Sequence, residues 1–509
     1  NGDRVAVAHG NDQVTYAELH ARAEAAAAWL ESAGVARGDR VGVHLYKSIE
    51  EVVAIFAVAR VGAAVVNINY QWTVAQLDYV VRDAGIRVLF ADQRRAVELA
   101  DSGLPEGLTD VLVKGNAPTH PSMSPWGDVE RGAPRAPIPD DDTTLGAILY
   151  TSGSTGAPKG VMLSHRNLVL GARSVSEYLE LTSSDRLLSV LPFSFDYGLN
   201  QLLDMCLLGG TTVLQPVVMP SVIAKTLVEQ QITGFAAVPT IWIQLVRYLE
   251  DVTTDLPALR LVTNSGGKVP DPILEEMPRV FPQARIFLMY GLTEAFRSTY
   301  LPPHLFQEKR GSMGRDIPNV ETFVIKEGGV CGPGEQGELV HRGPLVSMGY
   351  WGRPDATDAK IRVCPQLQDR IGDEKVVYSG DIVRVDEDGF YWFVSRADTM
   401  IKSSGFRLSP TEVEETLYQS GFINEVVAFG VEDELRGQVV HVAVSAKGGA
   451  KLDDKALQDY CRKSMPHYMQ PTRFHHWEGI MPRTASGKID AKNVAAECRS
   501  SLQPHNNQE

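Results

Sequence analysis

The first part of the chain alternates between segments with a helical hydrophobic period and short apolar runs. Residues 15–34 (TYAELHARAEAAAAWLESAG) and 48–62 (SIEEVVAIFAVARVG) predict amphipathic or buried helices. Strands are predicted at DRVGVHL (39–45), AAVVNIN (63–69) and RVLFA (87–91), with a further helix from about Val74. Repetition of strand, helix and strand predicts a largely parallel sheet covered by helices.

The pattern changes in the last third of the chain. The segment GGVCGPGEQGELVHRG (328–343) is rich in glycine and turns, which is typical of antiparallel strands and hairpins. After SRADTMIKSSGFRLSP (395–410), a helix, two strands and another helix are predicted in a unit of about 100 residues. We therefore predict an α/β fold. Its large N-terminal domain (1–397) has parallel-rich sheets covered by helices plus a β-rich part, and its small C-terminal domain (398–509) is α+β and mobile.

The composition is that of a globular enzyme and disfavours several other classes. A chain of 509 residues exceeds one hydrophobic core, and 44% hydrophobic with 22% charged residues is a usual balance for folded proteins. A net charge of −14 argues against a nucleic-acid or anionic-membrane binder. The longest apolar stretch is too short to span a bilayer, and no signal peptide is visible. The five cysteines form no CxxC pair, so we predict a cytoplasmic protein without a zinc or redox motif.

A bare, hydroxyl-rich loop is predicted at the end of a strand, where parallel sheets bind ligands. YTSGSTGAPKG (150–160) follows the apolar run TTLGAILY and combines three glycines, four aliphatic hydroxyls and Lys159. Glycines let backbone N–H groups turn toward an anion, and the hydroxyls and the lysine add donors and charge. The loop therefore predicts a polyphosphate cradle, although its spacing differs from that of the G-x-x-x-x-G-K-[ST] loop. A flexible polar loop is the alternative.

Four segments resemble motifs of the AMP-forming adenylating superfamily, which includes acyl-CoA synthetases, peptide-synthetase adenylation domains and firefly-type luciferases. YTSGSTGAPKGVMLSHRNL (150–168) resembles its phosphate loop, and MYGLTEA (289–295) its aromatic-Gly-x-Thr-Glu motif. YSGDIVRVDEDGFYWFVSRADTMIKSSGFRLSPTEVEE (378–415) is similar to its ribose and hinge segment, and PRTASGKID (482–490) to its lysine loop. The motifs keep their order over more than 300 residues, so the similarity covers essentially the whole chain.

The resemblance implies a two-step reaction that uses ATP and Mg²⁺. A carboxylate attacks the α-phosphorus of ATP, and a thiol then takes the acyl group from AMP; both steps develop negative charge. Lys488 is the implied catalytic lysine, Glu294 the Mg²⁺ ligand and Thr293 its neighbour at the α-phosphate. The implied ATP-binding residues are Thr151, Ser152, Gly153, Ser154, Thr155, Gly156 and Lys159 at the triphosphate, Gly266, Tyr290 and Gly291 around the adenine, and Asp381 and Arg396 at the ribose.

The same resemblance implies that the C-terminal domain moves. Asp398 matches the hinge about which that domain rotates between the two half-reactions, and Gly405 would lie beside a pantetheine arm. Without the other motifs, Glu294 would be interpreted as a solvated loop residue, Lys488 as a surface lysine and Tyr290 as a core residue.

The stretch LPFSFDYGLNQLL (191–203) bears on the choice of acid. Its Phe195-Asp196 pair resembles a motif of amino-acid-activating domains, in which the aspartate pairs with the substrate ammonium. The alternative is that Asp196 only caps a helix beginning near Gly198. Arg297 would meet a second carboxylate or another polar group of the acid, or would pair with Asp196 or another acidic residue and close the pocket. The other pocket residues implied by the resemblance are Tyr197, Asn200, Thr240, Thr263, Ser265, Met289 and Ser298.

The preferred function is a ligase that transfers an α- or β-amino acid to the phosphopantetheine of a carrier protein. The chain resembles β-amino-acid-activating ligases of macrolactam polyketide assembly and acyl-CoA ligases linked to bacterial exosortase clusters. It has no Gly-Gly-x-Ser attachment site, so a carrier protein would act in trans. The alternatives are an acyl-CoA ligase for a non-amino acid, with coenzyme A as acceptor, and a degenerate nucleotide-binding scaffold. No nucleic-acid or membrane partner is expected.

Overall fold

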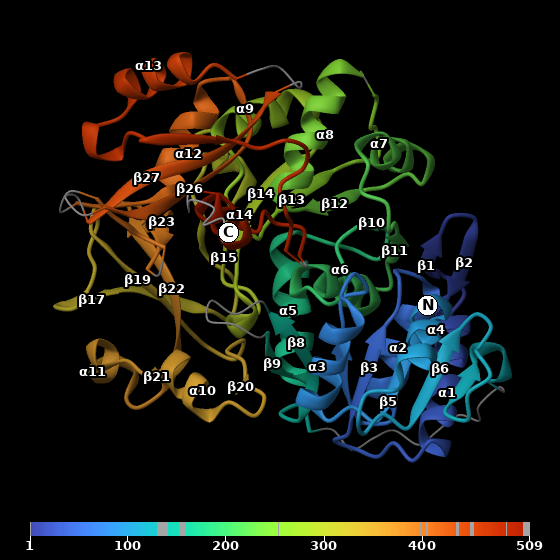
Figure 1. Cartoon of the computed structure of the whole chain (residues 1–509). Helices are drawn as coiled ribbons and strands as arrows, with labels where there is room; N and C mark the ends of the chain where they lie inside the picture. Colours follow the sequence, from blue (N-terminus) through green and yellow to red (C-terminus); the bar gives the residue numbers. More distant parts are fainter. Residues whose placement is uncertain are drawn as a thin grey trace, which may run out of the picture.

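The computed structural model describes residues 2–129, 141–151, 158–252, 254–397, 399–403, 406–433, 437–447, 452–484 and 486–501. Its elements follow the hydrophobic pattern closely near the N-terminus (Figure 1). Helix α1 (Tyr16–Ser32) begins after Thr15, whose hydroxyl accepts from the backbone N–H of Glu18 while the Glu18 carboxylate accepts from that of Thr15. This capping box explains why the helix begins there.

Sheet B carries the strands predicted at the N-terminus. Its spatial order is β20 (Gly349–Tyr350), β9 (Lys159–Ser164), β8 (Leu145–Thr151), β4 (Ala64–Asn67), β3 (Arg40–His44), β5 (Val88–Asp92), β6 (Asp110–Lys114) and β7 (Met123–Pro125). The pairs from β8 to β7 are parallel, whereas β9 returns antiparallel to β8 and pairs Lys159 with Thr151. The loop predicted to hold phosphates therefore connects two neighbouring strands at the sheet end.

Sheet A is formed mainly from the middle of the chain. Its spatial order is β16 (Arg315–Asp316), β15 (Thr299–Leu301), β14 (Arg285–Tyr290), β13 (Leu261–Asn264), β12 (Gly234–Ala237), β10 (Arg186–Ser189), β11 (Thr211–Leu214), β1 (Val5–His9) and β2 (Asp12–Thr15). The strands from β14 to β1 are parallel, and the edge strands are antiparallel. The predicted parallel-rich architecture is confirmed.

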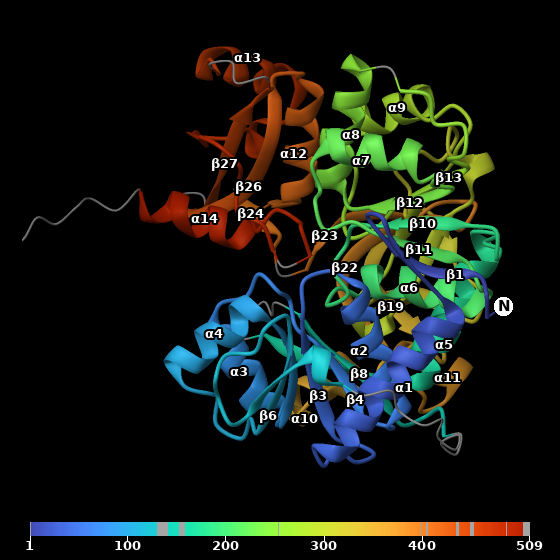
Figure 2. The same cartoon turned by 90° about the vertical axis from the view of Figure 1, so that its right-hand side faces the viewer.

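Helices form layers around these sheets (Figure 2). Between sheets A and B lie α1, α2 (Ile49–Arg60), α5 (His165–Tyr178) and α6 (Asp196–Leu208). The outer face of sheet B is covered by α3 (Val74–Ala84) and α4 (Gln93–Ser102), and that of sheet A by α7 (Pro220–Glu229), α8 (Pro239–Asp251) and α9 (Asp271–Val280). Burial on both faces explains the continuous apolar runs of the parallel strands.

The β-rich part and the C-terminal part are built differently. Sheet C is antiparallel and comprises β18 (Gly329–Val330), β17 (Glu321–Lys326), β19 (Gln336–Arg342), β22 (Lys375–Val385), β21 (Ile361–Val363) and β23 (Tyr391–Arg396), with α10 (Pro354–Lys360) and α11 (Gln368–Ile371) beside it. Sheet D comprises β25 (Phe406–Leu408), β24 (Ile401–Ser403), β27 (Gly437–Ala446), β26 (Ile423–Asp433) and β28 (Arg473–His476), and packs with α12 (Pro410–Gln419), α13 (Asp454–Ser464) and α14 (Ala491–Ser500). The predicted α+β class of the C-terminal part is confirmed.

The C-terminal part docks on sheet A and its helices through polar contacts. The Glu415 carboxylate of α12 lies 2.7 Å from Lys268 Nζ and accepts from the backbone N–H of Asp271 at 3.0 Å. The Thr240 hydroxyl of α8 donates to the Gly487 carbonyl at 2.9 Å. The predicted domain boundary falls at Asp398, which lies outside the described residues, so the boundary stays a prediction.

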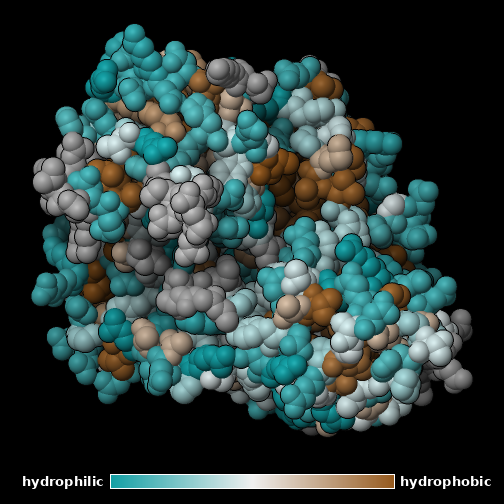
Figure 3. Space-filling view, in the orientation of Figure 1, coloured by the Kyte–Doolittle hydropathy of each residue, from teal (hydrophilic) through white to brown (hydrophobic). Residues whose placement is uncertain are grey.

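The molecular surface shows little sign of a membrane-binding face on the side that Figure 3 draws. On the face in Figure 3 hydrophilic residues predominate, apart from a hydrophobic hollow near α7 and α8. Among the described residues, no helix is both long and apolar enough to cross a bilayer.

Candidate active site

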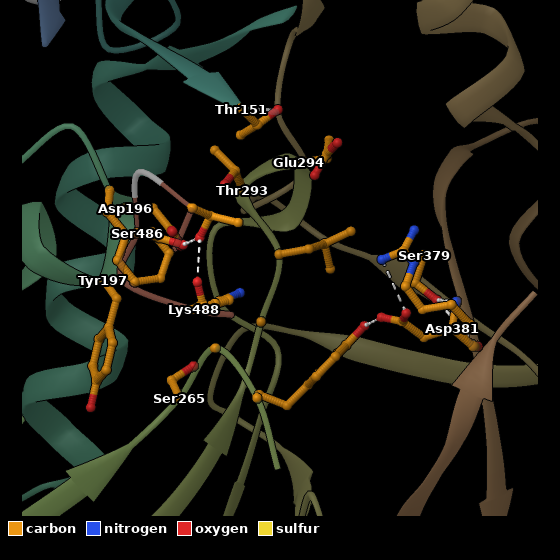
Figure 4. Close-up of a pocket in the computed structure, with 18 of the residues that line it drawn as sticks. Thr151, Asp196, Tyr197, Ser265, Thr293, Glu294, Ser379, Asp381, Ser486 and Lys488 are labelled. Carbon is orange, nitrogen blue, oxygen red and sulfur yellow. Dashed lines mark hydrogen bonds and ion pairs between the residues drawn. The ribbon is translucent and has the colours of Figure 1, made fainter. Parts of the chain in front are cut away.

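A cleft of about 1150 Å³ lies between sheets A, B and C and the C-terminal lysine loop. Small-molecule pockets usually measure about 300–1000 Å³, so this cleft has room for a nucleotide together with a second ligand. The predicted residues that line it are Thr151, Lys159, Asp196, Tyr197, Ser265, Gly266, Met289, Tyr290, Gly291, Thr293, Glu294, Arg297, Asp381, Arg396 and Lys488. Segments more than 300 residues apart in sequence thus meet at one site (Figure 4).

Asp381 and Tyr290 form one end of the cleft. The Tyr290 hydroxyl donates to Asp381 Oδ2 at 2.5 Å, and Arg396 Nη1 lies 3.3 Å from Asp381 Oδ1. Asp381 and Arg396 are opposite each other in the β22–β23 ladder, which fixes their spacing. Burial raises the pKa of Asp381, and Arg396 and Tyr290 oppose that shift. The ionised carboxylate offers acceptors for two hydroxyls, as the ribose role requires.

One face of Tyr290 is covered from within the protein. The His341 ring lies 6.0 Å from the Tyr290 ring, with an angle of 22° between the planes. His341 is buried, and burial lowers its pKa to about 3, so it packs as a neutral ring. This arrangement supports Tyr290 as one wall of a planar slot whose other residues include Gly266 and Gly291.

Glu294 is held by a residue that the sequence reasoning missed. The Tyr350 hydroxyl donates to Glu294 Oε1 at 2.5 Å, and the ring of Tyr350 lies 5.6 Å from Lys159 Nζ. The backbone carbonyl of Glu294 accepts from the Ser347 N–H at 2.8 Å. Tyr350 thus joins the predicted metal ligand to the end of the phosphate loop. A hard oxygen ligand beside the predicted phosphate loop fits Mg²⁺.

Lys488 reaches the centre of the cleft (Figure 4). Its loop is closed by hydrogen bonds between Thr484 N–H and the Lys488 carbonyl at 2.8 Å and between Gly487 N–H and the Thr484 carbonyl at 2.9 Å. A Cβ atom at Gly266, whose φ is +85°, would lie 2.8 Å from Lys488 Cε, so glycine permits this close approach. Burial lowers the pKa of Lys488, while the carboxylates of Asp196 and Asp381 raise it.

Asp196 forms a buried ion pair. Arg297 Nη1 donates to Asp196 Oδ2 at 2.7 Å, and Arg297 Nη2 donates to the Asp196 carbonyl at 3.1 Å. The two side chains are 5% and 3% exposed. Of the two possibilities that the sequence left open for Arg297, the structure contains the pair with Asp196. Helix α6 begins at Asp196 itself, with Phe195 at the N-cap position, so the interpretation of Asp196 as the cap of a helix beginning near Gly198 is wrong for this structure.

The remaining predicted acid-pocket residues are divided among three environments. Asn200 and Thr263 line a second, smaller cavity beside α6 rather than the cleft, and Tyr197 lines both. Thr240 contacts the lysine loop, and Ser298 is fully buried; neither lines the cleft. Ser152, Gly153, Ser154, Thr155, Gly156, the hinge candidate Asp398 and the thiol-channel candidate Gly405 lie outside the described residues.

Further polar residues line the cleft without having been predicted. Lys360 of α10 donates to the Ser379 carbonyl at 2.7 Å, and burial lowers its pKa. Asn67 is the last residue of β4. Within the described structure, neither of its buried side-chain polar atoms has a hydrogen-bond partner. The buried Asn264 Oδ1 is also unpartnered there. Such atoms fit a polar ligand in the cleft. Two sequence features could have indicated these residues: the asparagines of AAVVNIN (63–69), and the polar segment that follows GYW (349–351) and ends at Lys360.

Comparison with known proteins identifies the family. A model of the AMP-binding enzyme family matches residues 1–351, and one of the AMP-binding enzyme C-terminal domain matches residues 412–488. The chain belongs to the AMP-binding enzyme family. The family and fold predicted from the four motifs are therefore confirmed.

Relatives within the AMP-binding enzyme family are similar over nearly their whole length. The 2-succinylbenzoate–CoA ligase of Geobacillus kaustophilus is 31% identical, over 96% of this chain and 94% of its own. A feruloyl-CoA synthase of Amycolatopsis is also 31% identical, over 95% and 94% respectively. The solved structure of o-succinylbenzoate coenzyme A synthetase from Bacillus subtilis, in complex with ATP and magnesium ion, gives a TM-score of 0.83 at 26% identity and covers 97% of each chain. The names of these relatives include coenzyme A and neither an amino acid nor a carrier protein.

Proposed function

We propose that the protein is an AMP-forming ligase that joins a carboxylic acid to coenzyme A with consumption of ATP. The observation that carries this proposal is the position of Lys488 in the cleft, between Asp196 and Asp381 (Figure 4). A cation there meets both an attacking carboxylate and an α-phosphate. The names of the relatives support coenzyme A as the acceptor.

Nucleotide binding is assigned to three groups of residues. Tyr290 stacks on the adenine, and Asp381 accepts from the ribose hydroxyls with Arg396 beside it. Thr151, Lys159 and the intervening loop hold the triphosphate. Glu294, positioned by Tyr350, would hold Mg²⁺, which when bound neutralises phosphate charge.

The first half-reaction follows from these positions. A carboxylate oxygen of the acid forms a bond to the α-phosphorus, the bond from that phosphorus to the bridging oxygen breaks, and pyrophosphate leaves. Lys488 stabilises the negative charge that develops on the α-phosphoryl oxygens. In the second half-reaction the thiol sulfur, having lost its proton to solvent, attacks the acyl carbon and AMP leaves with its carboxyl-derived oxygen.

The two half-reactions are proposed to use different positions of the C-terminal domain. With Lys488 in the cleft, the described arrangement is suited to adenylation. We retain domains of 1–397 and 398–509, with Asp398 as the hinge and Gly405 beside the incoming thiol, as part of the proposal. The contacts of Glu415 with Lys268 and Asp271 would break during the rotation.

An acid panel tests the function. ATP–pyrophosphate exchange is measured with fatty, aromatic, dicarboxylic and amino acids, and the preferred acid is then offered coenzyme A or a phosphopantetheinylated carrier protein. We expect exchange that depends on the acid and thioester formation with coenzyme A. Absence of exchange with every acid would favour the degenerate scaffold.

A second candidate is an amino-acid ligase that acts on a carrier protein in trans. It is favoured by Asp196, which lines the cleft next to Lys488 at the start of α6. An α- or β-ammonium would then have to compete with Arg297 for this carboxylate. Preference for the carrier protein over coenzyme A, together with exchange confined to α- or β-amino acids, would support this candidate.

A further inference from the structure

A small recess, mostly apolar in its lining but with several polar side chains, lies beside α6 and adjoins the cleft. Its volume is about 20 Å³, and its polar lining residues are Tyr197, Asn200, Gln201, Asp204, Thr263 and Arg297. Tyr197, Met289 and Arg297 line both the recess and the cleft, so their side chains form the wall between the two. This volume suits one group about the size of a water molecule.

Asp204 is an unusual residue for such a place. Its side chain is buried, and Asn200 Nδ2 donates to both carboxylate oxygens, at 2.8 Å and 2.9 Å. Within the described part of the chain it forms no ion pair at contact distance. Burial raises its pKa well above the usual value, and the charge of Arg297 partly opposes that shift. A buried carboxylate without a paired cation is costly, and such groups concentrate at functional sites.

Two further acceptors of the recess lack partners. Asn200 Oδ1 and Gln201 Oε1 are buried and accept no hydrogen bond from the described residues. With Asp204 they supply three acceptor side chains on neighbouring turns of α6. A protonated amine carries three N–H donors and a positive charge, whereas a hydroxyl carries one donor and no charge. The chemistry of the recess therefore favours an ammonium group.

The charges along α6 lead to the same ligand. Asp196, Asn200 and Asp204 are spaced four residues apart, so their side chains lie on one face of the helix. Arg297 is bound to Asp196 at the first of these positions. A further cation beside Asp204 would balance its carboxylate in the same way.

We propose that this recess binds a protonated amine of the acid substrate that is remote from its carboxyl group. The proposal rests on the proposed function and narrows its substrate class to acids with a distal amine. Asp204 follows Asp196 by eight residues, about 12 Å along the helix axis. Because Lys488 Nζ lies 5.5 Å from the Phe195 ring at the start of α6, the reacting carboxylate is bound near that end.

The helix spacing sets the length of the acid. If the carboxylate is bound level with Asp196, one hydrogen bond of about 3 Å at each end leaves about 6 Å between carboxylate and amine, which is about five bonds of an extended chain. An α- or β-amine is too close to the carboxylate to reach the recess. Entry requires the Arg297 side chain to shift within the wall, at the cost of some of its hydrogen bonds to Asp196 and Phe296.

The test compares matched acids with the full chain. The kcat/KM for pyrophosphate exchange is measured with 5-aminopentanoate, pentanoate and 3-aminopropanoate in the wild type, Asp204→Asn, Asp204→Leu and the control Leu207→Gln, which changes an exposed residue of α6. We expect 5-aminopentanoate to be preferred at least about a hundredfold over both other acids, Asp204→Asn to remove most of that preference, and Leu207→Gln to keep it. Asp204→Leu should raise pentanoate exchange.

Equal use of 5-aminopentanoate and pentanoate by the wild type would overturn the proposal, and that comparison requires no variant to fold. Parallel losses for both acids in Asp204→Asn would assign Asp204 a structural role instead. Calorimetric binding of 5-aminopentanoate separates this proposal from the proposed function. Binding that depends on Asp204 without any exchange would refute the ligase activity and retain the recess, whereas exchange without a preference for the amine would do the reverse.

Discussion

Arg297 Nη1 lies 2.7 Å from Asp196 Oδ2, and this ion pair occupies the place where an amino-acid substrate was expected to put its ammonium group. Arg297 also donates to the Phe296 carbonyl at 2.9 Å, so the guanidinium is held by three hydrogen bonds. An arriving α-ammonium would have to replace this well-held cation.

The pair gives a first prediction about stability. Arg297→Met leaves the Asp196 carboxylate buried without a cation and should lower the free energy of unfolding by roughly 3–5 kcal/mol. Adding Asp196→Asn should recover much of the loss, because the neutral amide no longer needs a cation. Denaturant unfolding of both variants measures the coupling, and additive losses would contradict a direct pair.

The second prediction concerns Tyr350. Tyr350→Phe removes the hydrogen bond to Glu294, and a hydrogen bond to a charged group contributes about 1.5–3 kcal/mol. The Mg²⁺ concentration needed for half-maximal ATP binding, measured by calorimetry, should rise by about tenfold or more. Tyr391→Phe is the matched control, since its hydroxyl donates to the Thr322 carbonyl outside the cleft. An unchanged Mg²⁺ requirement in Tyr350→Phe would show that Glu294 does not depend on this contact.

The third prediction is a narrowed pH profile. The reaction needs Asp381 ionised and Lys488 protonated, and burial raises the pKa of the first and lowers that of the second. As the pH falls, activity should therefore be lost at a pH higher than the pKa of an ordinary aspartate. As the pH rises, activity should be lost at a pH lower than the pKa of an ordinary lysine. The pH dependence of kcat/KM for ATP in pyrophosphate exchange reports both groups in the free enzyme.

A substitution assigns the alkaline limb of that profile. Residual activity of Lys488→Arg should persist to higher pH than the wild type, since a guanidinium stays protonated, while the acid limb stays in place. The same alkaline limb in both proteins would remove Lys488 from the titration.

The fourth prediction separates the half-reactions. Glu415→Gln weakens the ion pair between Glu415, which is 14% exposed, and Lys268, which is 29% exposed. A loss of up to about 1 kcal/mol of docking free energy should slow adenylation by several-fold. Thioester formation from a supplied acyl-adenylate should keep its rate, because the docked arrangement is not used in that step. Asp358→Asn, which breaks the surface pair with Lys375, is the control. Equal slowing of both steps by Glu415→Gln would oppose the assignment of this contact to adenylation.

The sequence was most informative where local pattern and spacing decide the structure. Ser48 and Thr73 precede α2 and α3 as capping residues, and the apolar runs became buried parallel strands. The proposed nucleotide-binding residues came from motifs, and the structure brings Asp381, Glu294 and Lys488 into one cleft.

The acid pocket was harder to predict because it depends on contacts between distant segments. The pairing of Asp196 with Arg297 joins residues 101 positions apart, and no local pattern distinguishes it from a free carboxylate. Tyr350, in β20 of sheet B, and Lys360, at the end of α10, also line the cleft, although the hydrophobic pattern around them gives no hint of a ligand. Thr240 was assigned to the pocket from motif position, yet its hydroxyl contacts the lysine loop.

The most direct test of the ligase account is acid-dependent ATP–pyrophosphate exchange by Lys488→Ala, beside the wild type and the exposed α13 control Lys463→Ala. Using the preferred acid, we predict that exchange by Lys488→Ala falls by about a hundredfold to a thousandfold, while the calorimetric Kd for ATP stays nearly unchanged, because this lysine acts on charge that develops in the transition state. A supplied acyl-adenylate should still yield the coenzyme A thioester. Near-wild-type exchange by Lys488→Ala would contradict the account.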